Sequence, residues 1–457
     1  MRNFAKHFVL ESAILSTDRS VELTEYNLLS LTDFEVFEEL DLPYVTGIFT
    51  FTDTKNVLDG IDFQGSERLK ITLSAGTDNT DTVPITKTFV LDYIIETKRV
   101  NDSFDQVFVH GTEDLDFESN VQNISKSFQG SSIDIITDIA TNYLDKDIKV
   151  AGSDDQQLKV VIPNLDPIES MCWIKNRATN ADGMPFYLFS IFGDNVLRYY
   201  NIGDMLQQPA MNNNTPYVYS SAGSTQQSPY SDITSIKRFE YSDNENLYRV
   251  IKSGFIGSKN LFINTITGTF KQIDYKVENQ LFGMMNDRNY FPKGQTRFSY
   301  GPNTKVLDKK LSDYQSRVKS QIQSAGSYWG QGNFKTYNEE SNDGKHLHKI
   351  NSGALKTFLS KNVITIQVDG KPYATGPDNK LIENHNTIGR VIKMLFYESG
   401  SDDENTVKVD RKKSGDYLIF SARHTFSTNL YNVNLTCVKL SSLNEDGVQL
   451  SSAGGVN

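Results

Sequence analysis

Two long stretches of this chain alternate apolar and polar residues with a period of two, one within residues 1–117 and one in the last third. In residues 69–74 (LKITLS) the odd positions are apolar and the even positions polar, and residues 431–437 (YNVNLTC) repeat the pattern. Strands that bury one face produce this alternation. Several such strands in about 110 residues predict a small antiparallel barrel or sandwich. The fold is therefore expected to be mainly β.

Two long hairpins near the ends of these stretches resemble each other. Residues 89–107 and 417–434 both begin with an aromatic residue, alternate in the same way and have nearly equal lengths. Any two amphipathic hairpins look alike, so the residues alone leave two interpretations open, a chance similarity and a duplicated barrel.

The segment between them, residues 118–206, predicts a smaller α+β part. Apolar residues fall at helical spacing over 133–144, behind serines at 131–132 that can cap the first turn. The sequence DPIE at 166–169 combines an Asp N-cap, a Pro at the first helical position and a Glu three residues after the cap, and predicts a helix to about residue 180. Short strands are expected at 159–162, 186–191 and 197–200.

The remaining segments are more polar. Residues 207–230 predict a linker or a long surface loop, and a helix is expected at 307–323. The tail that ends in Gly454 and Gly455 is expected to be free until a partner binds it. The predicted domains are a first β-barrel (1–117), the α+β domain (118–206), a second β-barrel (207–284 and 351–440), a polar insertion (285–350) and the C-terminal tail (441–457).

Negative charge is concentrated in one part of the chain. The net charge is −11, and residues 1–120 hold 9 Lys and Arg against 23 Asp and Glu, a balance of −14 that leaves the rest near neutral. Proteins that grip a phosphate backbone use Lys and Arg to release counterions, so the acidic total argues against such binding. A conduit that must not hold DNA remains compatible with it.

Cysteine content and hydropathy argue against disulfide-rich, secreted and membrane-spanning proteins. Cys172 and Cys437 are far apart, so neither a disulfide framework nor a cysteine zinc cluster is expected, which fits synthesis in a reducing compartment. We find no apolar signal core at the start and no run of about 18 apolar residues. Neither secretion by that route nor insertion into a membrane is expected.

Motifs of catalysis and nucleotide binding are absent from the sequence. It contains no phosphate-binding Gly-x-x-x-x-Gly-Lys-Ser/Thr, no Gly-x-Ser-x-Gly and no His-Glu-x-x-His. His346 and His348 could offer two imidazoles to a metal if they lie on a strand, but a solvated polar loop is favoured. The acidic runs 35–41 and 113–116 could supply the two carboxylates of a glycosidase, although solvated edges are favoured. We expect no enzyme, no cofactor and no bound metal.

Several stretches together resemble a known family. Residues 44–53 (YVTGIFTFTD) and 56–69 (NVLDGIDFQGSERL) look like the first barrel of the baseplate central hub proteins of T-even-type contractile-tailed phages, the tail hub or late control protein D-like family. In that family a strand ending in Asp leads through Asn-x-Leu-Asp to Gly-x-Glu-x-Leu. Further similar segments are 127–130 (SFQG), 162–167 (IPNLDP), 173–178 (WIKNRA) and 415–426 (GDYLIFSARHTF).

The resemblance implies a ring-shaped homotrimer in which each subunit contributes two related barrels. Such a pseudo-sixfold ring adapts a sixfold tail tube to a threefold central spike and lets DNA pass without specific binding. The implied partners are the spike, which can carry a lysozyme, the tail tube protein and baseplate wedge proteins. The implied location is the tail baseplate of the virion, after assembly in the host cytoplasm. No catalytic residue is carried over, and the duplicated barrel becomes the preferred interpretation of the paired hairpins.

Two other functions remain as alternatives, a cell-wall hydrolase at the tail tip and a receptor-binding tail protein. For a hub, part of the negative charge in residues 1–120 is expected to face the pore, where like charge keeps passing DNA from adhering. The candidate pore-facing carboxylates are Asp53, Asp59, Asp62 and Glu67.

Overall fold

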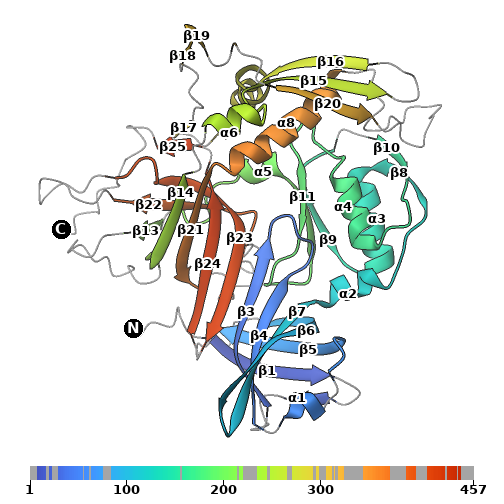
Figure 1. Ribbon diagram of the computed structural model, residues 1–457, viewed down its shortest axis with the longest axis vertical. Helices are drawn as coiled ribbons and strands as arrows, with labels where there is room; N and C mark the ends of the chain where they lie inside the picture. The colour runs from blue at the N-terminus through green and yellow to red at the C-terminus, as the bar shows by residue number, and fades with distance from the viewer. Residues whose placement is uncertain are drawn as a thin grey trace, which may run out of the picture.

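The computed structural model places both β-rich ends of the chain side by side, with helices and smaller sheets packed around them (Figure 1). It describes residues 8–16, 20–22, 29–54, 56–60, 63–75, 84–154, 157–213, 216–219, 234–243, 247–264, 270–291, 295–297, 305–310, 313, 317–323, 343–370, 387–397, 409–427, 430–439 and 441–443.

One continuous, almost entirely antiparallel sheet dominates the molecule. A branch from β23 adds β22 (Val391–Phe396), which carries β13 (Tyr217–Tyr219) in parallel. The other strands lie in the order β14 (Arg238–Asp243), β21 (Asn362–Asp369), β24 (Leu430–Val438), β23 (Gly415–Ser427), β3 (Leu29–Glu39), β4 (Thr46–Asp53), β7 (Phe104–Glu113), β6 (Ile85–Asn101), β5 (Glu67–Ala75), β1 (Phe8–Ser16) and β2 (Ser20–Glu22).

The alternation in the sequence accounts for how these strands pack. In β24, Tyr431, Val433, Leu435 and Cys437 are buried, whereas the residues between them are partly exposed. Their side chains join one hydrophobic core that extends through both halves of the sheet. The prediction of one-faced strands at both ends of the chain is confirmed.

Each half of the sheet has the same five-strand topology. In the first half the hairpin β3–β4 is followed by β5, β6 and β7, and β7 returns to pair with β4. In the second half β14 and β21 take the places of β3 and β4, and β22, β23 and β24 take those of β5, β6 and β7. The two similar hairpins of the sequence, β6–β7 and β23–β24, therefore occupy equivalent positions in two copies of one motif.

The expected pair of closed barrels is not found among the described strands. Instead, β3 pairs with β23 from Glu39 opposite Ser421 to Asp33 opposite Ser427, and this ladder joins the two halves. It supplies hydrogen-bond partners to a strand edge that would otherwise be unpaired. In the second half a single bridge between Val218 and Ser235 links β13 to the residues that precede β14.

A second hydrophobic core lies in the helical part at the right of Figure 1. Ser131 caps α3 in a capping box with Asp134, and Asp166 caps α4 by accepting a hydrogen bond from the Glu169 N–H, as predicted. Helix α4 ends at Lys175, short of residue 180, because the chain turns at residues 176–178. The elements are α2 (Asp114–Asn120), α3 (Ser132–Leu144), α4 (Pro167–Lys175), α5 (Ile202–Gln207), the pair β8 (Ser127–Ser131) and β10 (Gln157–Val161), and the sheet β11 (Phe186–Phe189), β12 (Leu197–Asn201) and β9 (Ile148–Ala151).

The segment between β14 and β21 folds at the top of Figure 1 as a small sheet with helices. The helix expected at 307–323 is wrong, because residues 317–323 form β20, which pairs in parallel with β15. Val318 and Ile322 are four residues apart, a spacing that shares one face in a strand as well as in a helix. The elements are α6 (Leu247–Lys252), β15 (Gly257–Asn264), β16 (Phe270–Lys276), the π-helix η2 (Glu278–Phe282), α7 (Gly283–Asp287), β17 (Gln295–Arg297), β18 (Lys305–Val306), β19 (Lys309–Lys310), β20 (Arg317–Gln323) and α8 (Asp343–Leu359).

The first residues after β24 are also held by the fold. Strand β25 (Ser441–Leu443) pairs with β17, and Ser441 is fully buried, so this part of the expected free tail is ordered. The rest of the tail, including Gly454 and Gly455, lies outside the described residues. Within the described helices, none is long and apolar enough to cross a membrane.

Candidate functional site

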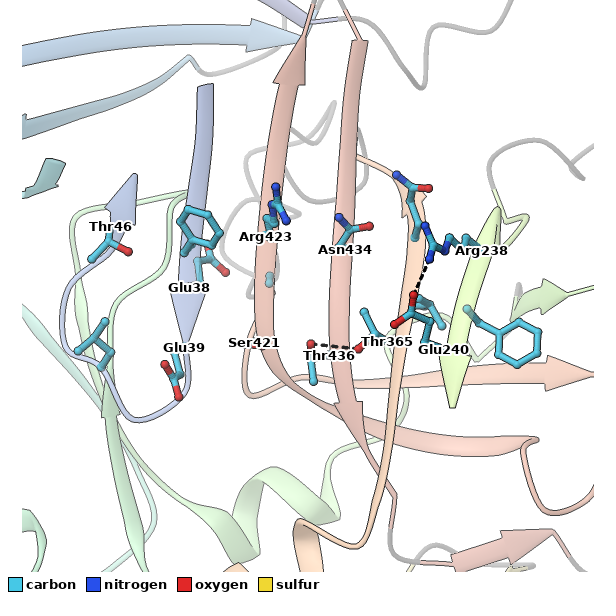
Figure 2. Close-up of a pocket in the computed structure, with 16 residues that line it drawn as sticks. Glu38, Glu39, Thr46, Arg238, Glu240, Thr365, Ser421, Arg423, Asn434 and Thr436 are labelled. Atoms are coloured by element: carbon cyan, nitrogen blue, oxygen red, sulfur yellow. Dashed lines mark hydrogen bonds and ion pairs between the residues drawn. The ribbon is translucent and has the colours of Figure 1, made fainter. Parts of the chain in front are cut away.

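A groove crosses the sheet where its two halves meet (Figure 2). It has a volume of about 510 Å³ and is lined from β3 and the start of β4 on one side, and from β23, β24, β21 and β14 on the other. Because side chains of a strand alternate between its faces, the same strands present their polar residues here and their apolar residues to the core.

Neutral polar side chains form the middle of the groove. Ser421, Asn434, Thr436, Thr365 and Gln367 come from three adjacent strands, and the hydroxyls of Thr365 and Thr436 lie 3.5 Å apart. Hydroxyl and amide groups both donate and accept hydrogen bonds, so this surface can hold water or make uncharged contacts.

The two arginines beside the groove are paired with carboxylates. Arg423 forms an ion pair of 2.5 Å with Glu35 across the β3–β23 ladder, and Arg238 forms one of 2.6 Å with Glu240 two residues along β14. The Arg423 guanidinium also lies 5.6 Å from the ring centre of Phe37. These pairs offset the charge of both guanidinium groups beside the groove.

A buried polar cluster lies behind the groove. His424 Nδ1 lies 2.7 Å from the Tyr431 hydroxyl, and His424 Nε2 lies 3.3 Å from Glu38 Oε1. The Glu38 carboxylate also accepts hydrogen bonds from the Phe192 N–H, at 2.5 Å, and from the Thr387 hydroxyl. Burial by itself raises the pKa of a carboxyl, but His424 and these hydrogen bonds hold the pKa of Glu38 below its usual value.

A buried ion pair involves the acidic run 113–116. Lys87 Nζ lies 2.6 Å from Glu113 Oε1, both side chains are at most 3% exposed, and Glu113 Oε2 accepts a hydrogen bond of 3.1 Å from the Val45 N–H. The interpretation of runs 35–41 and 113–116 as solvated edges is therefore wrong for Glu38 and Glu113. Strand parity could have located both, because Glu38 follows Phe34 and Val36 on one face and Glu113 follows Val107 and Val109.

Two of the four candidate pore-facing carboxylates have described side chains, and both bind the backbone. Asp53 is 3% exposed and accepts hydrogen bonds from Val57 and Leu58 at the start of α1 (Val57–Gly60). Glu67 is 6% exposed and accepts hydrogen bonds from three consecutive N–H groups, those of residues 64–66. Asp62 and the Asp59 side chain lie outside the described residues. Within the chain Asp53 and Glu67 stabilise local turns, and their orientation toward a pore stays a prediction.

The two histidines considered as metal ligands lie on α8, not in a loop or strand. Residues two apart on a helix project in different directions. His346 is 5% exposed and packs against the Phe262 ring, with 4.3 Å between ring centres. Across the described residues, no group of three or more His, Cys, Asp or Glu side chains is placed to hold a metal ion.

Neither cysteine has the environment of a nucleophile. Cys437 is fully buried in the core and Cys172 is partly buried, and burial raises the pKa of both thiols. Cys437 is part of the main hydrophobic core, on the buried face of β24.

Comparisons with known proteins give fold similarity without sequence similarity. No family model and no curated protein matches the chain. A tail protein from Neisseria meningitidis MC58 matches with a TM-score of 0.51 at 10% identity, over 95% of this chain and 96% of that one. The 43 kDa tail protein of prophage MuSo2 from Shewanella oneidensis matches with a TM-score of 0.50 at 12% identity, over 94% of this chain and 98% of that one. The chain therefore has the fold of these two tail proteins over nearly its whole length.

Proposed function

We propose that this chain is a structural protein of a phage tail, the central hub of a baseplate. The observation that carries the proposal is the repeated five-strand motif, within a fold shared with two tail proteins over nearly the whole length of all three chains. Two similar motifs in one chain offer two similar docking faces.

The repeat gives a reason for a trimer. Three chains with two motifs each present six near-equivalent positions, which can meet a sixfold tube on one side and a threefold spike on the other. The proposed partners are thus two further copies of the chain, a tail tube protein, a central spike and baseplate wedge proteins. Its proposed place is the tail baseplate of the virion, assembled in the host cytoplasm.

DNA is proposed to pass through the centre of the ring without being held. The excess of acidic residues in 1–120 disfavours adhesion of a polyanion, and the arginines beside the groove already pair with carboxylates. The pore-facing orientation of Asp53, Asp59, Asp62 and Glu67 belongs to this ring and is tested only with it.

The chain is also proposed to have no enzymatic activity of its own. Glu38 and Glu113, the buried members of the two acidic runs, are each 2% exposed and lie beside His424 and Lys87, which leaves neither carboxylate free to act on a polysaccharide. Incubating the purified protein with peptidoglycan tests this point, since release of soluble sugar would support a hydrolase.

Oligomer mass and shape test the hub directly. The purified chain is weighed by light scattering, alone and with the spike and tube proteins of the same phage, and imaged by electron microscopy. We expect a particle of three times the 51.6 kDa chain mass, a hollow ring in images, and binding to the spike protein. A monomer without affinity for the spike would overturn the proposal, and an elongated fibre would favour a receptor-binding protein.

A further inference from the structure

The distal half of β6 is an exposed strand edge. Its ladder with β5 ends at Leu91, and within the described residues 92–101 pair only with β7. Large apolar side chains on this half are exposed, with Tyr93 at 51%, Ile95 at 45% and Val100 at 53%. An edge with unpaired backbone groups and exposed apolar residues is a template for pairing with another strand.

Strand β14 provides a second edge of this kind. It pairs with β21 along its whole length, and no described strand lies against its other side. In the sheet order, β14 and β6 are separated by six strands, so the two edges lie apart within one chain.

The repeat shows what these edges are equivalent to. In the first motif the strand that matches β14 is β3, and in the second motif the strand that matches β6 is β23. These two equivalents, β3 and β23, pair with each other inside the chain. The β3–β23 ladder within one chain is therefore the equivalent of a ladder between β14 and β6.

The ladders fix this equivalence residue by residue. Counted from the hairpin turn, Lys98 of β6 lies opposite the third residue of β7, and Thr425 of β23 lies opposite the third residue of β24. Glu240 of β14 and Glu35 of β3 also occupy equivalent positions. Followed across β21, the partner of Glu240 lies opposite the seventh residue of β24. Followed across β4, the partner of Glu35 lies opposite the seventh residue of β7. Within the chain Thr425 lies directly opposite Glu35.

We propose that β14 of one copy pairs antiparallel with the part of β6 around Lys98 in a second copy, with Glu240 opposite Lys98. Opposite charges at directly opposed positions of two strands attract, so the register derived from the repeat is also favoured electrostatically. In the isolated chain each of these charges pairs along its own strand, Lys98 with Glu96 at 2.9 Å and Glu240 with Arg238 at 2.6 Å, and all four side chains are at least half exposed.

Three copies joined in this way form a closed ring of six motifs. Junctions within chains, β3 with β23, alternate with junctions between chains, β14 with β6. The inference rests on the proposed hub, whose trimer it explains, and it places a neighbouring strand beside Ile95 and Val100, which the chain alone leaves exposed.

Disulfide cross-linking tests the register. The pair Lys98→Cys and Glu240→Cys is made in one chain that also carries Cys172→Ser, while buried Cys437 is retained. After oxidation we expect covalent dimers and trimers on a non-reducing gel, because directly opposed strand residues have Cβ atoms about 5 Å apart. The matched control is Thr97→Cys with Glu240→Cys, whose side chains would lie on opposite faces; cross-linking equal to that of the first pair would overturn the register.

Charge reversal gives a second measurement without cysteines. Lys98→Glu places like charges opposite each other and is expected to weaken each subunit contact about 5-fold. The double variant Lys98→Glu with Glu240→Lys is expected to restore trimer formation, whereas failure of that rescue would count against the pairing.

The two proposals fail in different ways. If the unmodified chain forms no trimer under any condition, the ring and the pairing are both overturned. If it forms a trimer that neither cross-links through positions 98 and 240 nor responds to charge reversal, this pairing alone is overturned and the hub stands.

Discussion

Glu38 Oε1 on β3 and His424 Nε2 on β23 lie 3.3 Å apart in the core, at the ladder that joins the two halves of the sheet. Both are at most 2% exposed. The same carboxylate accepts hydrogen bonds from the Phe192 N–H and the Thr387 hydroxyl. One buried acid therefore contacts both motifs of the sheet and two further segments of the chain. A charge at such a place is tolerated only because each of its oxygens has a partner.

Replacing Glu38 by Gln removes the charge and keeps an acceptor for the Phe192 N–H. We expect the free energy of unfolding at pH 7 to fall by about 2 kcal/mol, measured by urea denaturation. The folded pKa of Glu38 lies below that of the unfolded chain, so its contribution is fully present above about pH 4.3 and is lost as pH falls through the lower folded value. The variant should therefore lose less stability in acid. Glu39→Gln, at the exposed neighbour, is the control and should change stability by less than about 0.5 kcal/mol.

Replacing Lys87 by Met leaves the Glu113 carboxylate buried without its counter-ion. We expect a loss of about 3 to 5 kcal/mol in the free energy of unfolding, because an unpaired buried charge is far more costly than the pair. Lys70→Met, the same change at an exposed position of β5, is the control and should have little effect. Equal effects of the two variants would show that the ion pair contributes nothing to stability.

Because of the buried Lys439 side chain, we expect the free energy of unfolding to rise with pH. Its ammonium donates hydrogen bonds to the backbone carbonyls of Lys412 and Ser414, and burial lowers its pKa to about 7. The folded chain therefore releases this proton above about pH 7, whereas the unfolded chain keeps it to about pH 10.4. Between these values the unfolded state binds more protons, so the free energy of unfolding should rise by up to about 1.4 kcal/mol per pH unit.

The variant Lys439→Met isolates this contribution. Urea denaturation of both proteins at several values between pH 7 and 10 should give a steeper rise for the unmodified chain. Identical slopes would mean that Lys439 keeps its proton in the fold.

Two glycine substitutions are expected to have opposite effects. A Cβ at Gly370 would overlap ring atoms of the buried Tyr431, so Gly370→Ala should cost about 1 to 3 kcal/mol. A Cβ at Gly353 meets nothing within 4 Å on the exposed side of α8, so Gly353→Ala should stabilise by about 0.5 to 1 kcal/mol. Thermal unfolding of both variants measures the difference, and a gain at position 370 would contradict the packing of Tyr431.

Local structure was largely predictable from the sequence. The caps at Ser131 and Asp166 are predicted by local residue types and are present in the structure. The turn between β6 and β7 depends on contacts of the same range, since the Asn101 side chain accepts hydrogen bonds from the N–H groups of Ser103 and Phe104. All of these interactions join residues a few positions apart, which is the range over which propensity and spacing carry information.

Long-range pairing was not predictable in the same way. Glu35 and Arg423 are 388 positions apart, and no local pattern states that β3 pairs with β23 instead of closing its own barrel. The sequence indicates that the two halves are similar, but it does not indicate that a ladder joins them into one sheet. Charge alone does not show what a carboxylate binds, whereas the turns after Asp53 and before Glu67 place backbone N–H groups against these two side chains.

The connection between the first two strands differs greatly between the two motifs. In the first motif the short loop 40–45 joins β3 to β4, whereas in the second motif residues 244–361 stand between β14 and β21. In a ring of three copies, residues 244–361 would therefore be present on every second motif. A protein that contacts only the strands would find six similar binding sites on the ring. A protein that contacts residues 244–361 would find three. One duplicated chain would therefore present sixfold and threefold symmetry through different parts of its surface.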